Sequence, residues 1–231
     1  MKYRALALAA LFPLSMIAAC NNNDDNNGTT TPPVTDATVR FVNATGTSFD
    51  VASNGTVGTG NGSIAYGGST SCIPINAASS GLSLRNAGTS TTISGFTPAF
   101  TTGGNYTVVA YPGTGGTTQF ATLSNTYTPT SGNAGLRVFN AANAGSFDTY
   151  VTTPGGAMTT ANATATAFGG NSAFFSVPAS SQQVRFTNAG TQTVGLDAGN
   201  NTFVAGQNST IVLAPAATGT TTLRSFYSGG C

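Results

Sequence analysis

The chain has 231 residues, of which 39% are hydrophobic and only 6% are charged, with seven Lys and Arg residues against six Asp residues. Histidine, glutamate and tryptophan are absent and the only lysine is Lys2, so the sequence excludes catalysis by imidazole, by a Glu acid or base, or by a Schiff-base lysine. The length accommodates one large β domain or two domains of roughly 100 residues each.

Residues 1–20 have the pattern of a bacterial lipoprotein signal peptide. Lys2 and Arg4 supply the positive start, residues 5–14 form a short apolar segment, and small residues precede Cys20 as in the lipoprotein cleavage box. The apolar segment is too short to cross a bilayer of about 30 Å, whereas two or more acyl chains hold a protein stably on a membrane. We therefore expect lipid on Cys20 and anchoring through it. The alternative is an ordinary signal peptide with Cys20 lost or free.

Residues 21–36 are expected to form a disordered tether, because they contain one aliphatic side chain, Val34, and no aromatic one. Such a segment buries too little apolar surface to offset the entropy of ordering. Asn21, and not Asp, follows the cysteine, which in enteric-type bacteria resembles sorting to the outer membrane. The localisation that we expect is therefore the outer membrane, on its periplasmic or its surface face.

The chain after residue 20 carries five arginines and six aspartates, a net charge of −1, without a basic cluster. Such a surface lacks the clustered positive charge that binds the phosphates of a nucleic acid. The partners that we expect are the membrane, through Cys20, and other envelope proteins or glycans, and not nucleic acid.

Four short motifs occur twice, in the same order and 97 to 103 residues apart. The pairs are 39–44 with 136–141, 65–68 with 167–170, 86–89 with 188–191, and 105–109 with 208–212. Four collinear matches indicate an internal duplication. We predict two copies of one domain, residues 37–130 and 134–231, joined by a short turn-rich stretch.

Each copy is predicted to be all-β, because strand-favouring Thr, Val, Phe and Tyr are plentiful and short runs lie between Gly, Asn, Pro and Ser clusters. About seven strands in about 95 residues are typical of an Ig-like β-sandwich, so we expect two tandem sandwiches. The predicted strands are 38–43, 48–52, 69–75, 82–86, 91–96, 105–111 and 118–123, then 135–140, 146–151, 172–177, 183–188, 193–196, 208–213 and 221–227. The Ala/Thr run 157–167 is interpreted as a loop or irregular edge and not as a helix.

The strand that opens each copy reads hydrophobic-Arg-hydrophobic, followed by Asn with a small residue and then by an Asp-containing strand. This pattern resembles the domain of unknown function 4397, a family of secreted and surface-attached bacterial proteins, often lipoproteins with tandem repeats. The resemblance extends over nearly all of residues 37–231 and falls on Arg40, Asn43 and Asp50, and on Arg137, Asn140 and Asp148. The family has no established biochemical role, so the resemblance implies a fold and a location but no site.

Arg and Asp form the only charged constellation present in both copies. Arg40 precedes Asp50 by ten residues, and Arg137 precedes Asp148 by eleven, on consecutive predicted strands. If those strands are neighbours, each Arg and Asp could form a charge-assisted, bidentate ion pair. We favour structural ion pairs that fix the strand register over a carboxylate-recognition site, because a position present once per repeat more often serves the scaffold.

No arrangement of residues predicts catalysis or a metal site. Asp50 and Asp148 lie in different domains, and nothing brings them to the roughly 5–9.5 Å that glycosidase carboxylates require. Serine-hydrolase chemistry lacks its base, and a zinc site lacks His and paired Cys. Calcium bound by residues 197–201 is the remaining option, but a β-turn is favoured because one carboxylate is too few. We expect no catalytic residue, metal or cofactor.

Cys72 and Cys231 remain once Cys20 carries lipid. An oxidising compartment permits a disulfide between them, which would tie the end of the second copy to the first. The alternative is a buried thiol at Cys72, which aligns with Phe174, and a free thiol at Cys231. The sequence leaves both alternatives open.

The function that we predict is non-enzymatic: a structural or protein-interaction module at the cell envelope. The alternative is a binding protein for carbohydrate or another small envelope ligand, in which aromatic residues such as Phe174, Phe226 and Tyr106 would stack on the ligand. Core packing is the commoner fate of aromatic residues in strands, so this alternative ranks second.

Overall fold

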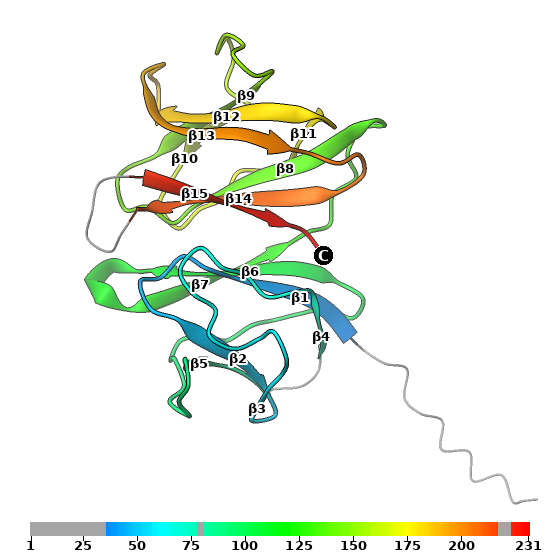
Figure 1. Ribbon diagram of the computed structural model, residues 1–231, viewed down its shortest axis with the longest axis vertical. Coiled ribbons are helices and arrows are strands. Elements are labelled where there is room, and N and C mark those ends of the chain that lie inside the picture. The colour runs from blue at the N-terminus through cyan, green and yellow to red at the C-terminus, as the bar shows by residue number, and fades with distance from the viewer. Residues whose placement is uncertain (1–35, 78–80, 217–222) are drawn as a thin grey trace, which may run out of the picture. The chain divides into compact units, whose positions relative to one another are not determined.

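The computed structural model describes residues 36–77, 81–216 and 223–231 (Figure 1). The expected signal peptide with its Cys20, and the expected tether up to residue 35, lie outside these residues.

The described residues form β-strands and one 3-10 turn, Thr114–Gly116, so the expected all-β class is confirmed. None of these residues belongs to a helix that is long and apolar enough to cross a membrane. The described residues form one compact unit.

The first copy forms a sandwich of two sheets (Figure 1). The larger sheet has the order β4-β1-β6-β7, with the bounds β4 (Ile73–Asn76), β1 (Asp36–Asn43), β6 (Asn105–Pro112) and β7 (Thr118–Ser124). The smaller sheet has the order β3-β2-β5, with the bounds β3 (Thr56–Val57), β2 (Phe49–Ser53) and β5 (Leu82–Asn86). The pair β1–β6 is parallel and the other pairs are antiparallel.

The second copy repeats this plan. One sheet has the order β11-β8-β14-β15, with the bounds β11 (Phe175–Pro178), β8 (Asn133–Asn140), β14 (Asn208–Pro215) and β15 (Leu223–Gly229). The other has the order β10-β9-β12-β13, with the bounds β10 (Ala163–Thr166), β9 (Phe147–Thr152), β12 (Ser181–Asn188) and β13 (Val194–Thr202). The parallel pair β8–β14 keeps the register of β1–β6, since Arg137 lies opposite Thr210 as Arg40 lies opposite Thr107.

The central parallel strands are buried on both faces. In β1, Val39 and Phe41 belong to the core of the first sandwich, whereas Val42, on the opposite face, belongs to a cluster that both copies share. In β8, Val138 likewise belongs to the core of the second sandwich, and Phe139, on the opposite face, belongs to the shared cluster. Because successive side chains of a strand point to opposite faces, each central strand serves two hydrophobic layers.

The shared cluster joins the two copies through the outer faces of their larger sheets. Its buried members are Val42, Ala44, Val109, Tyr111 and Leu123 from the first copy and Phe139, Ala141, Val212 and Ala214 from the second. Most of them are equivalent positions, which gives the contact an approximate two-fold symmetry. The link between the copies is therefore a packed hydrophobic layer.

Some predicted strands differ from the structure in extent. Residues 91–96 form no named strand, because Thr92 makes only an isolated bridge with Arg85. The strands predicted over 69–75 and 172–177 begin later in the structure, at Ile73 and Phe175, since only isolated bridges precede these residues. The run 157–167 contains an edge strand, β10, whose pairing with β9 has a register shift.

Candidate functional site

The two predicted Arg–Asp ion pairs, Arg40–Asp50 and Arg137–Asp148, are wrong. β1 and β2 belong to different sheets of one sandwich, and so do β8 and β9. Phe49 points into the core, so its neighbour Asp50 lies on the outer face of the smaller sheet, whereas Arg40 lies on the outer face of the larger one. The chain crosses between sheets after the first strand, and an Arg and an Asp on consecutive strands cannot meet.

Each aspartate instead joins two loops. The Asp50 carboxylate is 6% exposed and accepts hydrogen bonds from the backbone N–H of Ser63 (2.6 Å) and of Gly88 (2.8 Å). Ser63 has a φ of 51°, a left-handed conformation that non-glycine residues rarely adopt. The carboxylate therefore supports a strained turn as well as the loop that begins at Gly88.

Asp148 does the same in the second copy. It is also 6% exposed, and it accepts hydrogen bonds from the N–H groups of Ala165 (2.7 Å) and Gly190 (2.8 Å). Ala165, like Ser63, is left-handed, with a φ of 47°. The repeated aspartates are thus loop clamps.

The repeated asparagines are also structural. Asn43 is fully buried, and its amide donates to the carbonyls of Thr47 (2.8 Å) and Ile64 (2.7 Å). Asn140 is equally buried and donates to the carbonyls of Gly145 (2.9 Å) and Thr166 (3.0 Å). A buried amide with these bonds satisfies loop carbonyls that would otherwise be stranded away from water.

Arg137 is buried between the two copies, at 4% exposure. Its guanidinium donates to the carbonyl of Ser124 (2.7 Å), to Oδ1 of Asn125 (2.9 Å) and to Oγ1 of Thr210 (3.1 Å). Its Cζ lies 4.4 Å from the centre of the Phe174 ring. Burial lowers the pKa of Arg137 to about 10. Since Ser124 and Asn125 end the first copy, Arg137 fixes the start of the connection to the second.

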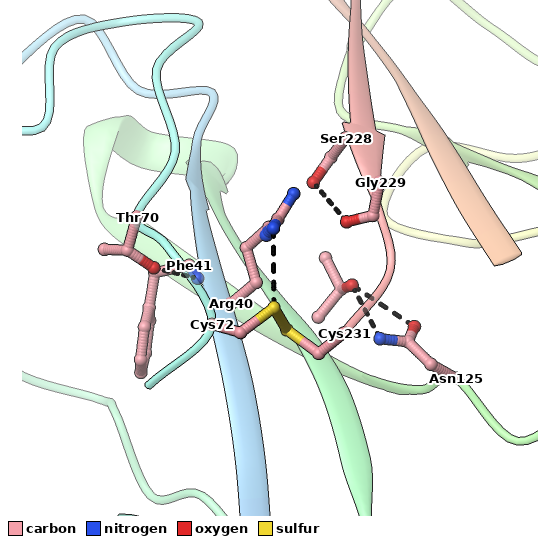
Figure 2. Close-up of a disulfide and its surroundings, with 9 residues drawn as sticks. Arg40, Phe41, Thr70, Cys72, Asn125, Ser228, Gly229 and Cys231 are labelled. Carbon is pink, nitrogen blue, oxygen red and sulfur yellow. Dashed lines mark hydrogen bonds between the residues drawn. A yellow bond between two sulfur atoms is a disulfide. The ribbon is translucent and has the colours of Figure 1, made fainter. Parts of the chain in front are cut away.

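Cys72 and Cys231 form a disulfide with a Cα–Cα distance of 5.6 Å (Figure 2). Arg40 donates to Sγ of Cys72 at 3.4 Å. The bridges of Ser69 and Asn171 to equivalent strands show that Cys72 occupies the position of Phe174. Arg40 therefore lies beside the disulfide as Arg137 lies beside an aromatic ring, and of the two alternatives that the sequence leaves open, the structure contains the bridge.

The Ala-aromatic-Gly-Gly motif of each copy contacts the other copy. The Tyr66 ring lies 5.0 Å from Phe226, edge to face, and its hydroxyl donates to the carbonyl of Pro215. In the reverse direction, the Phe168 ring lies 5.8 Å from Tyr111. The sequence identifies this motif as repeated, but its role in joining the copies appears only in the structure.

The first glycine of the motif allows this close approach. Gly67 has a φ of +78°, and a Cβ there would lie 2.7 Å from the Phe226 ring. Gly169, with a φ of +71°, places a Cβ 3.0 Å from the Tyr111 hydroxyl. Both the backbone conformation and the available space therefore require glycine at this position.

Gly67→Ala is expected to lower the free energy of unfolding by about 3 kcal/mol, because left-handed strain and overpacking against Phe226 add. Gly60→Ala is the matched control, since Gly60 has a φ of +77° and no atom within 4 Å of the added Cβ. The control should lose only about 1–2 kcal/mol. Urea unfolding measures both variants, and equal losses would show that the Phe226 contact does not restrict this site.

A polar groove of about 1020 Å³ lies where the two copies end. Asn105 and its equivalent Asn208 both line it, together with Asn125, Tyr127 and Gln207, and Arg40 also borders it. Several of its lining residues are carboxamides, and its location between two copies is typical of ligand sites. Asn105 and Asn208 begin a motif that is repeated in the sequence, but the convergence of these residues depends on how the copies pack.

The remaining sequence candidates are accounted for within the scaffold. Asp197 accepts from the N–H of Gly199 (2.8 Å) and from the Gln183 side chain (2.6 Å), but residues 197–201 belong to strand β13 and do not form the predicted β-turn. The described residues contain no group of three or more His, Cys, Asp or Glu side chains that could hold a metal ion. Phe175 packs against the second core, and Phe174 stacks on Tyr127 with centroids 5.1 Å apart.

The model of one protein family, described as domain of unknown function (DUF4397), matches residues 37–150. The match covers the first copy and continues through β8 and most of β9 of the second. The resemblance expected from the Arg, Asn and Asp pattern is thereby confirmed over these residues. No curated protein matches the chain.

Proposed function

Taking the resemblance of residues 37–150 to DUF4397 as the premise, we propose that the protein is a cell-envelope lipoprotein that acts as a non-enzymatic structural or protein-interaction module. It is held at the outer membrane by lipid on Cys20, and the segment between Cys20 and the first residue of β1, Asp36, spaces the two sandwiches from the membrane.

One observation carries the proposal. The repeated Asp and Asn residues of the first two strands of each copy are engaged inside the protein: Asp50, Asp148, Asn43 and Asn140 hold loops, and Arg137 joins the copies. A catalytic site needs acids, bases or nucleophiles aimed at a substrate. Repeated Asp and Asn residues that serve the scaffold support a rigid module, and the disulfide and the shared cluster support the same view.

Cys20→Ser is expected to release the protein from the membrane, because the lipid attaches through that sulfur. Labelling cells with an alkyne fatty acid and separating membranes on a density gradient measures both attachment and location. The wild-type protein should carry the label and sediment with outer membranes, whereas Cys20→Ser should carry none and stay soluble. Ser15→Ala, which leaves Cys20 in place, is the control. An unlabelled wild-type protein would contradict the anchoring.

The interaction role has a separate test in intact cells. A photo-cross-linking amino acid at Thr202 on the exposed edge strand β13 should give a discrete adduct with another envelope protein. The same group at Val212, fully buried between the copies, is the control and should give none. If a set of exposed positions on both sandwiches yields no adduct, the protein acts without a stable protein partner.

A further inference from the structure

We propose that the groove between the two copies binds a neutral oligosaccharide. The proposal adds a ligand to the interaction module proposed above and does not depend on its lipid anchor. The groove volume of about 1020 Å³ lies at the upper end of ligand sites, which span about 300–1,000 Å³. A site of this size accommodates several sugar units.

Three side chains at the groove are free to bind a ligand. Asn105 begins β6, Thr128 lies in the connection between the copies, and Gln207 precedes β14. All three are exposed, and none of their side chains hydrogen-bonds to another residue in the described part of the chain. A carboxamide or a hydroxyl both donates and accepts, as a sugar hydroxyl does, so these groups match a polyol.

The groove is lined by groups that are already fixed. The Asn208 amide donates to the carbonyls of Asn125 and Tyr127, both at 2.8 Å. Oδ1 of Asn125 accepts from Arg137 (2.9 Å) and from Thr107 (3.2 Å). A ligand that binds beside such groups loses less free energy to ordering of the protein.

Tyr127 supplies an aromatic surface. It lines the groove and is half-buried, and it stacks on Phe174 at an interplanar angle of 10°. The Tyr127 hydroxyl is hydrogen-bonded to Ser176 at 3.0 Å, which holds the ring in place. Aromatic rings that are fixed in this way offer an apolar face to the C–H groups of a sugar ring.

The charge of the groove favours a neutral sugar. Among the described residues that line the groove there is no Asp and one arginine, Arg40, which donates to Cys72. An acidic sugar would need a cation that is available to its carboxylate. The observations therefore select a neutral oligosaccharide over an acidic one.

The test uses the full chain carrying Cys20→Ser, purified from whichever fraction it enters, so that a wrong prediction about anchoring leaves the binding result intact. Calorimetry and ¹⁵N NMR with maltohexaose, cellohexaose, chitohexaose and mannohexaose, each to about 10 mM, detect a Kd of ~1 mM or tighter. Hexagalacturonic acid is the acidic probe. We expect binding of at least one neutral hexasaccharide with shifts at Asn105 and Gln207.

The double variant Asn105→Ala and Gln207→Ala should weaken that binding about 30-fold, since two hydrogen bonds are lost. Asn200→Ala, an exposed carboxamide on β13 outside the groove, is the matched control and should bind as before. Thr128→Trp, which fills the groove from an exposed position, should also abolish binding. Failure of all neutral probes, binding of the acidic probe alone, or an unchanged affinity in the double variant would overturn the proposal.

Discussion

Cys72→Ser and Cys231→Ser are each expected to lower the free energy of unfolding by about 4–5 kcal/mol. The disulfide joins residues 159 positions apart, and restricting so long a loop in the unfolded chain removes a large conformational entropy. It also holds the end of β15, in the second copy, against the first copy. The loss should therefore appear as reduced stability of both sandwiches together.

Urea unfolding under oxidising conditions measures this effect. The two single variants and the double variant should have the same stability, because each removes the same bond. Wild-type protein unfolded in a reducing agent should match them. A reduced wild-type protein as stable as the oxidised one would contradict the prediction.

Asp148→Ala is expected to lower the free energy of unfolding by about 3 kcal/mol, since two hydrogen bonds to a buried, charged acceptor are lost. The donors are Ala165 and Gly190, which belong to separate loops. Because the Asp148 carboxylate holds the N–H of the left-handed Ala165, the loop of Ala165 should also become more mobile.

Hydrogen exchange at Ala165 and Gly190, with urea unfolding, measures the loss of the clamp. Asp197→Ala is the control: Asp197 is an exposed aspartate of the same sheet, and its loss should cost less than about 1 kcal/mol. Asp148→Asn should fall between the two, because an amide oxygen can replace only one carboxylate oxygen. A stability of Asp148→Ala equal to that of Asp197→Ala would show that the clamp has no energetic role.

Much of the fold was predictable from the sequence, because four collinear motifs and period-two alternation are local signals. Val39 and Phe41, for example, alternate with Thr38 and Arg40 and lie in the first core. The predicted Arg–Asp pairing is wrong because consecutive strands of this chain, β1 and β2 or β8 and β9, belong to different sheets. In a sandwich the chain often crosses to the other sheet between strands, and alternation along one strand carries no information about that crossing.

The contact between the copies was harder to predict, although a signal was present. Residues 106–111 of β6 and 211–214 of β14 are nearly continuous apolar runs, which are typical of strands buried on both faces. The groove gave no such signal. Asn105 begins a repeated motif, but Thr128 and Gln207 belong to none, and only the packing of the two copies brings the three residues together.

The two-fold character of the contact has a consequence for how such repeats can be combined. Where the first copy presents large Tyr111 and small Ala121, the second presents small Ala214 and large Phe226 at the equivalent positions. Each copy thus buries the apolar outer face of the other copy's larger sheet, so the pair leaves no such face for a third copy. A longer relative built from this unit would need an even number of copies. An unpaired copy would expose a hydrophobic surface and would be prone to self-association.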